Sequence, residues 1–123
     1  MIQQINGLAG DVAAFRVSGE VTKEDYDSII LPTVENITSK FNHLNFLLVL
    51  NTDLKNYTWG AWMDDALVTL KNLAKFKRVA LVTDSEMVKK VTSFGAHFIP
   101  GEYRTYKLAE EASAVNWVGA AEL

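Results

Sequence analysis

The sequence contains no cysteine and few of the residues that break regular structure, with two prolines and seven glycines among 123 residues. Without cysteine the chain cannot form disulfides, hold zinc or iron–sulfur clusters through thiolates, or use a thiol nucleophile. The longest apolar run, 46–50, is far shorter than the roughly 20 residues of a membrane-spanning helix. The first twenty residues lack the basic start and apolar stretch of a secretory signal. We therefore expect a cytoplasmic protein with no stable membrane insertion.

The sequence also lacks the patterns that bind common cofactors. Twelve basic and fifteen acidic side chains give a net charge of −3, which argues against a nucleic-acid partner. Neither glycine-rich phosphate loop occurs, and the serines lack the elbow motif of serine hydrolases. The two histidines, His43 and His97, are far apart in sequence and in no metal-ligand spacing. We expect no catalytic residue, metal or cofactor, and interpret the protein as non-enzymatic.

What is present is an alternation of strand and helix patterns in a single domain covering 1–123, whose composition is 49% hydrophobic and 22% charged. Two short strands joined by a glycine-containing turn begin the chain and form an antiparallel pair. Three further strand patterns alternate with four helical ones. The expected strands are 2–5, 12–17, 45–51, 76–83 and 102–107, and the expected helices are 22–41, 59–73, 85–98 and 108–118.

This order predicts an α/β fold with a mostly parallel central sheet, an antiparallel N-terminal edge hairpin and four helices. The segments 46–50 and 79–82 are apolar at every position, as in parallel strands that helices cover on both faces. We expect these two segments to lie side by side and parallel in the interior. Segment 102–107 alternates aromatic and polar residues, which is typical of a half-exposed edge strand.

The first helical segment carries its own start and interruption signals. Thr22 offers a hydroxyl to cap the helix, and Pro32 predicts either a kink or a short helix that passes into a second one. The spacing predicts one buried stripe, made of Tyr26, Ile29, Ile30, Val34, Ile37 and Phe41. The last helix is expected to bury Leu108, Ala112, Val115 and Val118, and Asp84 or Ser85 to cap the helix that follows them.

Several short segments, taken in order, resemble the SpoIIAA-like branch of the STAS superfamily, which is related in fold to anti-sigma factor antagonists. The residues that carry the resemblance span nearly the whole chain: Gly19–Tyr26, Leu31–Pro32, Trp59–Trp62, Asp64–Asp65, Val79–Asp84, Tyr103–Tyr106, Glu111–Ala112 and Trp117–Val118. The resemblance implies a regulatory module that acts by protein–protein contact, gated by phosphorylation of a serine where the helix after a central strand begins. This chain has no serine in 51–58, so Thr52 and Thr58 are the possible phosphoacceptors, or simply helix caps.

The candidate site consists of aromatic residues near the carboxyl end of the central strands, where open parallel sheets bind ligands. Tyr57, Trp59, Trp62 and Phe98 are its candidate partner- or ligand-binding residues, although the spacing of Trp62 also fits core packing. Our first hypothesis is a protein partner or self-association as a homodimer. The alternative is a carrier that holds a small apolar ligand such as a lipid or acyl chain.

Two charged groups receive a simpler interpretation. Asp64 and Asp65 are adjacent in the sequence, so their side chains would point in different directions on a helix. We therefore interpret them as solvated carboxylates near the helix start rather than as a catalytic pair. Positive charge gathers around the second predicted helix end and the elements after it, at Lys71, Lys75, Lys77, Arg78, Lys89 and Lys90. This cluster is interpreted as a solvated face, with a weak anionic partner as the alternative.

Overall fold

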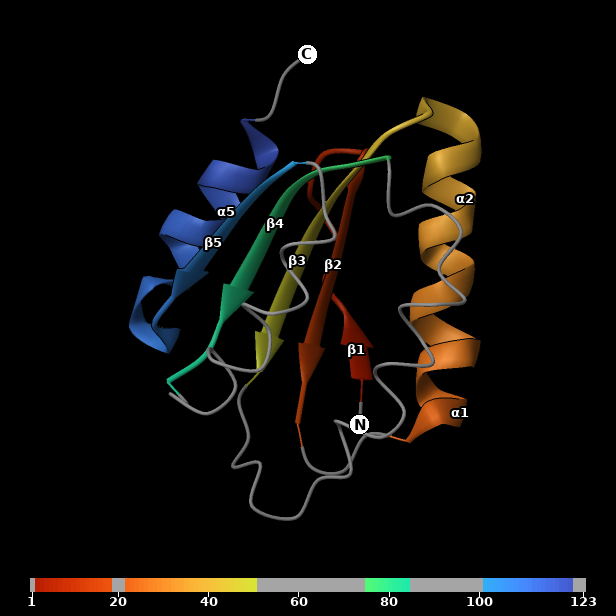
Figure 1. Cartoon of the computed structure of the whole chain (residues 1–123). Helices are drawn as coiled ribbons and strands as arrows, with labels where there is room; N and C mark the ends of the chain where they lie inside the picture. Colours follow the sequence, from red (N-terminus) through yellow and green to blue (C-terminus); the bar gives the residue numbers. More distant parts are fainter. Residues whose placement is uncertain (1, 19–21, 51–74, 85–100, 121–123) are drawn as a thin grey trace.

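The computed structural model describes residues 2–18, 22–50, 75–84 and 101–120, which form one five-stranded sheet with a helix against each face (Figure 1). The strands are β1 (Ile2–Gln4), β2 (Val12–Val17), β3 (Leu44–Leu50), β4 (Phe76–Val82) and β5 (Glu102–Tyr106). The helical segments are α1 (Lys23–Asp25), the π-helix η1 (Tyr26–Ile30), α2 (Leu31–Phe41), the 3-10 helix η4 (Leu108–Glu110) and α5 (Glu111–Gly119).

The strands lie in the sheet in their order along the chain, β1-β2-β3-β4-β5. β1 runs antiparallel to β2, whereas β2, β3, β4 and β5 are mutually parallel. The connection between the first two strands includes Gly7 at a φ of 85°, a conformation that favours glycine. The predicted N-terminal hairpin and the predicted mostly parallel sheet are both confirmed.

The two segments predicted to be central are neighbours. Phe46 of β3 pairs with Val79 of β4, and Val49 pairs with Val82, all in parallel register. Both strands have sheet neighbours on each side, and most of their side chains are buried. Because alternate residues of a strand face opposite sides, these strands contribute to two separate cores.

The core between the sheet and the first helical segment is built from large side chains. Phe15 of β2 and Phe76 of β4 are buried there, and the Phe46 ring lies between them, at centroid distances of 5.8 Å and 5.9 Å. From the helix side come Tyr26, Ile30, Val34 and Ile37, all buried. The predicted apolar stripe of this helix is therefore confirmed at these four positions.

The core on the opposite face, beneath α5, is built from smaller side chains. Ala14 of β2 and Ala80 of β4 face Ala114 and Val118 of α5, and all four are at most 1% exposed. Small residues on both surfaces let the helix pack close to the sheet, so this face needs no large ring to fill it. The larger side chains Tyr106 and Trp117 lie at the margin of this core, partly buried.

The start of the first helical segment follows the sequence prediction. The Thr22 hydroxyl accepts a hydrogen bond from the Asp25 N–H, and the Asp25 carboxylate accepts one from the Thr22 N–H, each at 3.1 Å. This reciprocal pair is a capping box. The π-helical turn η1 then precedes Pro32, and the Leu31 N–H donates to the Tyr26 carbonyl. Pro32 has no N–H, so it sits in the first turn of α2, as predicted for a short helix passing into a second one.

Two burial predictions are wrong, each at the end of an element. Phe41 is 44% exposed, because Asn42 ends α2 in a left-handed conformation with a φ of 59°. Its ring lies instead beside His43 and Gly10. Ala112 is exposed and Ala114 is buried in its place, because the last segment begins as a 3-10 turn, which shifts the inner face of the α-helix.

The second and third predicted helices, 59–73 and 85–98, lie outside the described residues. No helix in the described part of the chain is long and apolar enough to cross a bilayer.

Candidate functional site

The residues predicted to form the site fall on parts of the chain that the structure does not describe. They are the two possible phosphoacceptors Thr52 and Thr58 and the aromatic group Tyr57, Trp59, Trp62 and Phe98. The phosphorylation hypothesis and the apolar-carrier hypothesis therefore stay predictions. The distinctive side-chain group of the described residues comes from other parts of the chain.

At the carboxyl end of the sheet, the described polar residues Thr83 and Asp84 form hydrogen bonds within the protein. Thr83 is fully buried, and its N–H donates to the Tyr106 carbonyl at 2.9 Å. Asp84 Oδ1 accepts from the Leu108 N–H at 2.9 Å, so this carboxylate fixes the start of η4. The predicted cap of a helix starting near Ser85 concerns residues outside those described.

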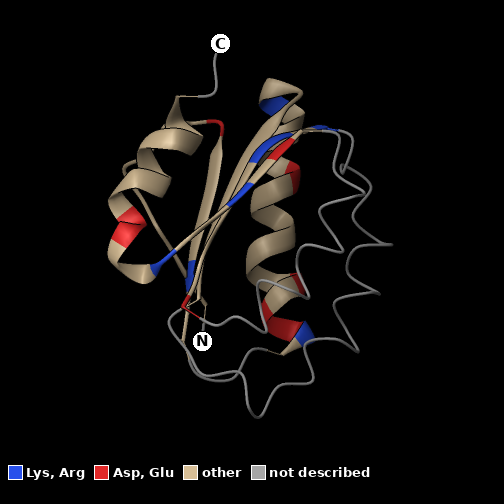
Figure 2. Ribbon diagram, turned by 60° about the vertical axis from the view of Figure 1, so that its left-hand side comes forward, with Lys and Arg blue, Asp and Glu red and all other residues tan. Residues whose placement is uncertain are grey.

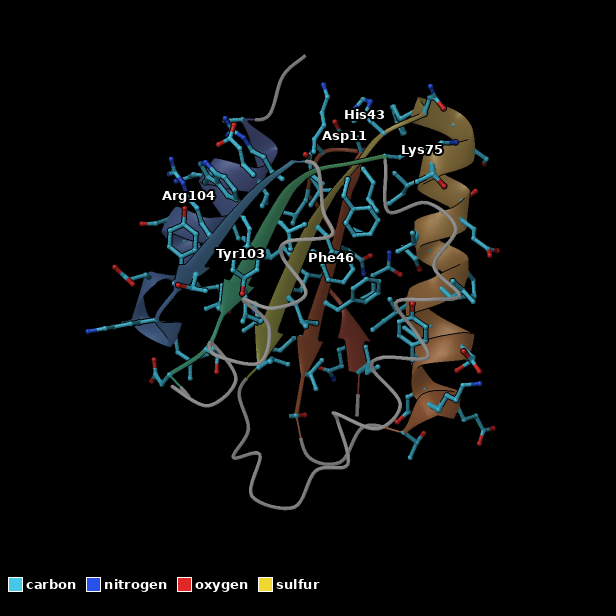
Figure 3. The ribbon with its side chains drawn as sticks, viewed as in Figure 1. Asp11, His43, Phe46, Lys75, Tyr103 and Arg104 are labelled. Atoms are coloured by element: carbon cyan, nitrogen blue, oxygen red, sulfur yellow. The ribbon has the colours of Figure 1, made fainter. Side chains whose placement is uncertain are left out.

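At the opposite end of the sheet, His43 lies against Asp11 (Figure 3). His43 Nε2 is 2.8 Å from Asp11 Oδ2, and Nδ1 is 3.1 Å from the Phe41 carbonyl oxygen. The buried Asn45 donates to the same carboxylate at 3.3 Å. Both imidazole nitrogens are thus engaged within the protein, which favours a structural role for His43, joining the end of α2 to the start of β2. His97 lies outside the described residues.

A different group of side chains stands out beside the edge strand β5, where two arginines approach one indole. The Arg78 guanidinium carbon is 4.9 Å from the Trp117 ring centroid, and that of Arg104 is 4.8 Å from it. Both distances are within the range of cation–π attraction. The Tyr106 ring centroid is 6.4 Å from that of Trp117. We call Arg78, Arg104, Tyr106 and Trp117 the arginine–tryptophan cluster.

The strand register explains why these side chains meet. On β4, Arg78 shares a face with Ala80 and Val82, whose side chains pack under α5. On β5, Arg104 lies opposite Ala80 in the parallel register, so it projects from the same face. Figure 3 shows Arg104 on the α5 side, away from the Phe46 and Tyr103 rings.

Arg78 is the internal member of the cluster and Arg104 the exposed one. Arg78 is half-buried, and its Nη1 donates to the Trp117 carbonyl at 2.7 Å. A cation at the carbonyl end of α5 also complements the helix dipole. Arg104 is exposed and its guanidinium contacts the ring of the half-buried Trp117. Packing against the indole therefore holds an exposed positive charge in place at the sheet edge.

The arginines of the cluster have no ion-pair partner among the described residues. Among the described residues, ion pairs join Arg16 with Glu111 and Lys23 with Asp27, and a hydrogen-bond contact joins His43 with Asp11. None of them includes a member of the cluster. Glu102, also exposed, lies opposite Arg78 in the register, yet no described residue lies within 4.0 Å of it as an ion-pair partner. Figure 2 shows acidic residues at the starts of α1 and α5, where Asp27 pairs with Lys23 and Glu111 with Arg16.

On the other face, one titratable side chain belongs to the core. Burial raises the pKa of Tyr26 to about 12, and the neighbouring carboxylates Asp27 and Glu35 add to the effect. The phenol therefore stays neutral at physiological pH and acts as a packing residue beneath η1.

Sequence reasoning named parts of the arginine–tryptophan cluster without joining them. Arg78 was one of the clustered cations, and Arg104 belonged to the predicted edge strand. The alternating pattern of 102–106 could have indicated part of the cluster, because it places Arg104 and Tyr106 on one face of the strand. What was missing was the register that brings Arg78 and Trp117 to the same place.

Comparisons with known proteins agree on the fold. A family model described as SpoIIAA-like matches residues 12–119. The chain is similar to a crystal structure of an uncharacterized protein of the DUF3478 family, with a SpoIIAA-like fold, from Shewanella loihica PV-4. That similarity has a TM-score of 0.67 and 26% sequence identity, and covers 95% of this chain and 93% of the other. No curated protein gives a significant match.

Proposed function

Because the chain belongs to the SpoIIAA-like family, we propose that it is a regulatory binding module without enzymatic activity, which acts by protein–protein contact through the β5 edge and the neighbouring surface of α5. The observation that carries this proposal is the arginine–tryptophan cluster, where an exposed guanidinium is held against a half-buried indole. Arginine, tryptophan and tyrosine are the residue types most enriched at protein interfaces and their energetic centres.

The position of the cluster supports contact with a protein. It lies beside β5, which pairs with β4 on one side and stands at the margin of the five-stranded sheet. An edge strand offers backbone donors and acceptors to a further chain. Backbone pairing gives affinity in such complexes, and neighbouring side chains give specificity. The aromatic and cationic groups beside β5 would supply that specificity.

The state of His43 supports the non-enzymatic part of the proposal. Each of its ring nitrogens already contacts an acceptor within the protein, Asp11 or the Phe41 carbonyl. A general base must have a nitrogen available to the substrate proton. The described residues also contain no group of three or more acidic, histidine or cysteine side chains placed to hold a metal ion.

Site-specific photo-crosslinking in extracts of the source organism tests the proposal. A photoreactive amino acid at Asn116, exposed on α5 next to Trp117, is expected to give discrete adducts with protein. The same probe at Asn36, an exposed residue on α2 across the sheet, serves as the matched control. Mass spectrometry of each adduct shows whether the captured chain is a second copy or another protein.

The expected adducts depend on the cluster. Arg104→Ala in the Asn116 probe protein should reduce their yield, because it removes the exposed charge without touching the core. Equal labelling from Asn36 and Asn116, or no protein adduct from Asn116, would contradict a binding role for this face.

A further inference from the structure

We infer that the partner of the β5 edge is a second copy of this chain, which pairs with it antiparallel so that Glu102 of each copy contacts Arg104 of the other. This inference rests on the proposed function and adds the identity of the partner and the register. Its starting point is that Glu102 and Arg104 have opposite charges, are both exposed, and have no ion-pair partner within 4.0 Å among the described residues.

The existing hydrogen bonds of β5 determine how a further strand can pair with it. The Tyr106 carbonyl accepts from the Thr83 N–H of the segment that follows β4. In a parallel ladder, alternate residues direct their backbone groups to the same neighbour. Even-numbered residues of β5 therefore direct them toward β4, and odd-numbered residues direct them outward. An antiparallel copy must consequently place even-numbered residues opposite even-numbered ones.

Among the registers that remain, charge favours the one in which residue 102 lies opposite residue 104. Pairing residue 102 with residue 102 places two carboxylates together, and pairing 104 with 104 places two guanidinium groups together. Like charges directly opposite each other destabilise a sheet. In the register where 102 lies opposite 104, each Glu102 meets an Arg104, and the two-fold symmetry forms the contact twice. Thr105 then lies opposite Gly101.

Strand geometry strengthens this contact. Residues 102 and 104 would form non-hydrogen-bonded pairs, in which the Cα atoms of an antiparallel ladder are closest and the side chains meet most directly. Each guanidinium is already held against Trp117, 4.8 Å from the ring centroid. An ordered side chain loses less conformational freedom when it binds. The arginine–tryptophan cluster would thus present Arg104 to the partner's carboxylate.

The opposite end of the sheet is a poorer site for such pairing. β1 comprises Ile2–Gln4 and carries no charged side chain, so neither its length nor its charge specifies a register. β5 is longer, and its sequence Glu-Tyr-Arg-Thr-Tyr contains no proline. A dimer joined at β5 would form one continuous sheet, with β1 at each outer edge.

Charge reversal tests the register directly. The wild-type protein is expected to sediment as a dimer at micromolar concentration, and either Glu102→Arg or Arg104→Glu should weaken association by roughly tenfold or more. The double variant, with both changes in one chain, restores opposite charges and should dimerise again. An equimolar mixture of the two single variants should form a heterodimer, because each supplies the charge that the other lacks.

Controls separate these results from effects of net charge or folding. Lys40→Glu and Glu35→Arg make the same charge changes at exposed positions of α2 and should leave association unchanged. Circular dichroism verifies that each variant is folded. A monomeric wild type, a dimer that tolerates both reversals, or single variants that fail to combine would overturn the inference. If the wild type is monomeric but Asn116 crosslinks to another protein, the inference fails and the proposed function stands. If the wild type is monomeric and Asn116 captures no chain, both fail.

Discussion

The guanidinium of Arg104, on the edge strand, lies 4.8 Å from the ring centroid of Trp117, on the last helix. This contact joins two elements at the margin of the α5 core, where Arg78 approaches the same ring from β4. It keeps an exposed cation in a defined position, with no ion-pair partner within 4.0 Å among the described residues. An ordered charge that forms no ion pair with the described residues is well suited to recognise a partner.

The two arginines of the cluster should contribute differently to stability. Arg78→Ala removes a half-buried side chain and leaves the Trp117 carbonyl without its 2.7 Å hydrogen bond, so the free energy of unfolding should fall by about 1.5–3 kcal/mol. Arg104→Ala removes an exposed cation–π contact and should cost about 0.5–1 kcal/mol. Urea denaturation of dilute protein measures both values. A larger loss from Arg104→Ala than from Arg78→Ala would contradict this assignment.

The approach of β5 to β4 begins at a glycine that no larger residue can replace. A Cβ atom at Gly101 would lie 2.1 Å from the Lys77 carbonyl oxygen and 2.5 Å from that of Phe76. Both neighbours are backbone atoms, so relief requires a shift of the strands. Gly101→Ala should therefore lower the free energy of unfolding by about 2 kcal/mol or more.

Gly119 provides the matched control for this substitution. A Cβ atom there meets nothing within 4 Å, and the residue ends α5. Gly119→Ala should be neutral or stabilise the protein by up to about 1 kcal/mol, because alanine favours the helix. Equal thermal stability of the Gly101 and Gly119 variants would show that the close approach at β5 is not a constraint.

Tyr26 should make stability sensitive to alkaline pH. Its pKa of about 12 in the folded chain, against 10.0 for an ordinary tyrosine, means that the unfolded chain loses the phenol proton first. The stabilising contribution is complete below pH 10 and is lost as the pH rises from 10 to 12, by up to about 1.4 kcal/mol for each pH unit.

Tyr26→Phe isolates this contribution, because phenylalanine keeps the ring and cannot ionise. The difference in unfolding free energy between wild type and variant should be constant from pH 7 to pH 9 and then move in favour of the variant. Denaturation at a series of pH values measures it. Parallel curves for the two proteins up to pH 12 would contradict the burial of the phenol.

Local patterns in the sequence were sufficient for most of the described fold. Thr22 is a helix cap because its hydroxyl and the Asp25 carboxylate lie three residues apart, and Pro32 marks the passage from one helical segment to the next because it lacks an N–H. The unbroken apolar strands 46–50 and 79–82 indicated a centre covered on both faces. Each of these features depends on residues close together in the chain.

The features that sequence reasoning missed depend on long-range geometry. Phe41 continues the helical stripe by spacing, but the left-handed Asn42 ends the helix there and leaves the ring outside. The arginine–tryptophan cluster joins residues 78, 104 and 117, and only the strand register and the packing of α5 bring them together. No local pattern specifies either, so the cluster could not be predicted as a unit.

The most direct test of a dimer at β5 is to measure hydrogen exchange of the Thr105 amide at increasing protein concentration. This amide faces outward from the edge of the sheet. We expect this amide to become more protected as concentration rises, while amides in α2 exchange at an unchanged rate. Exchange of Thr105 at the same rate from low micromolar to millimolar protein would contradict it.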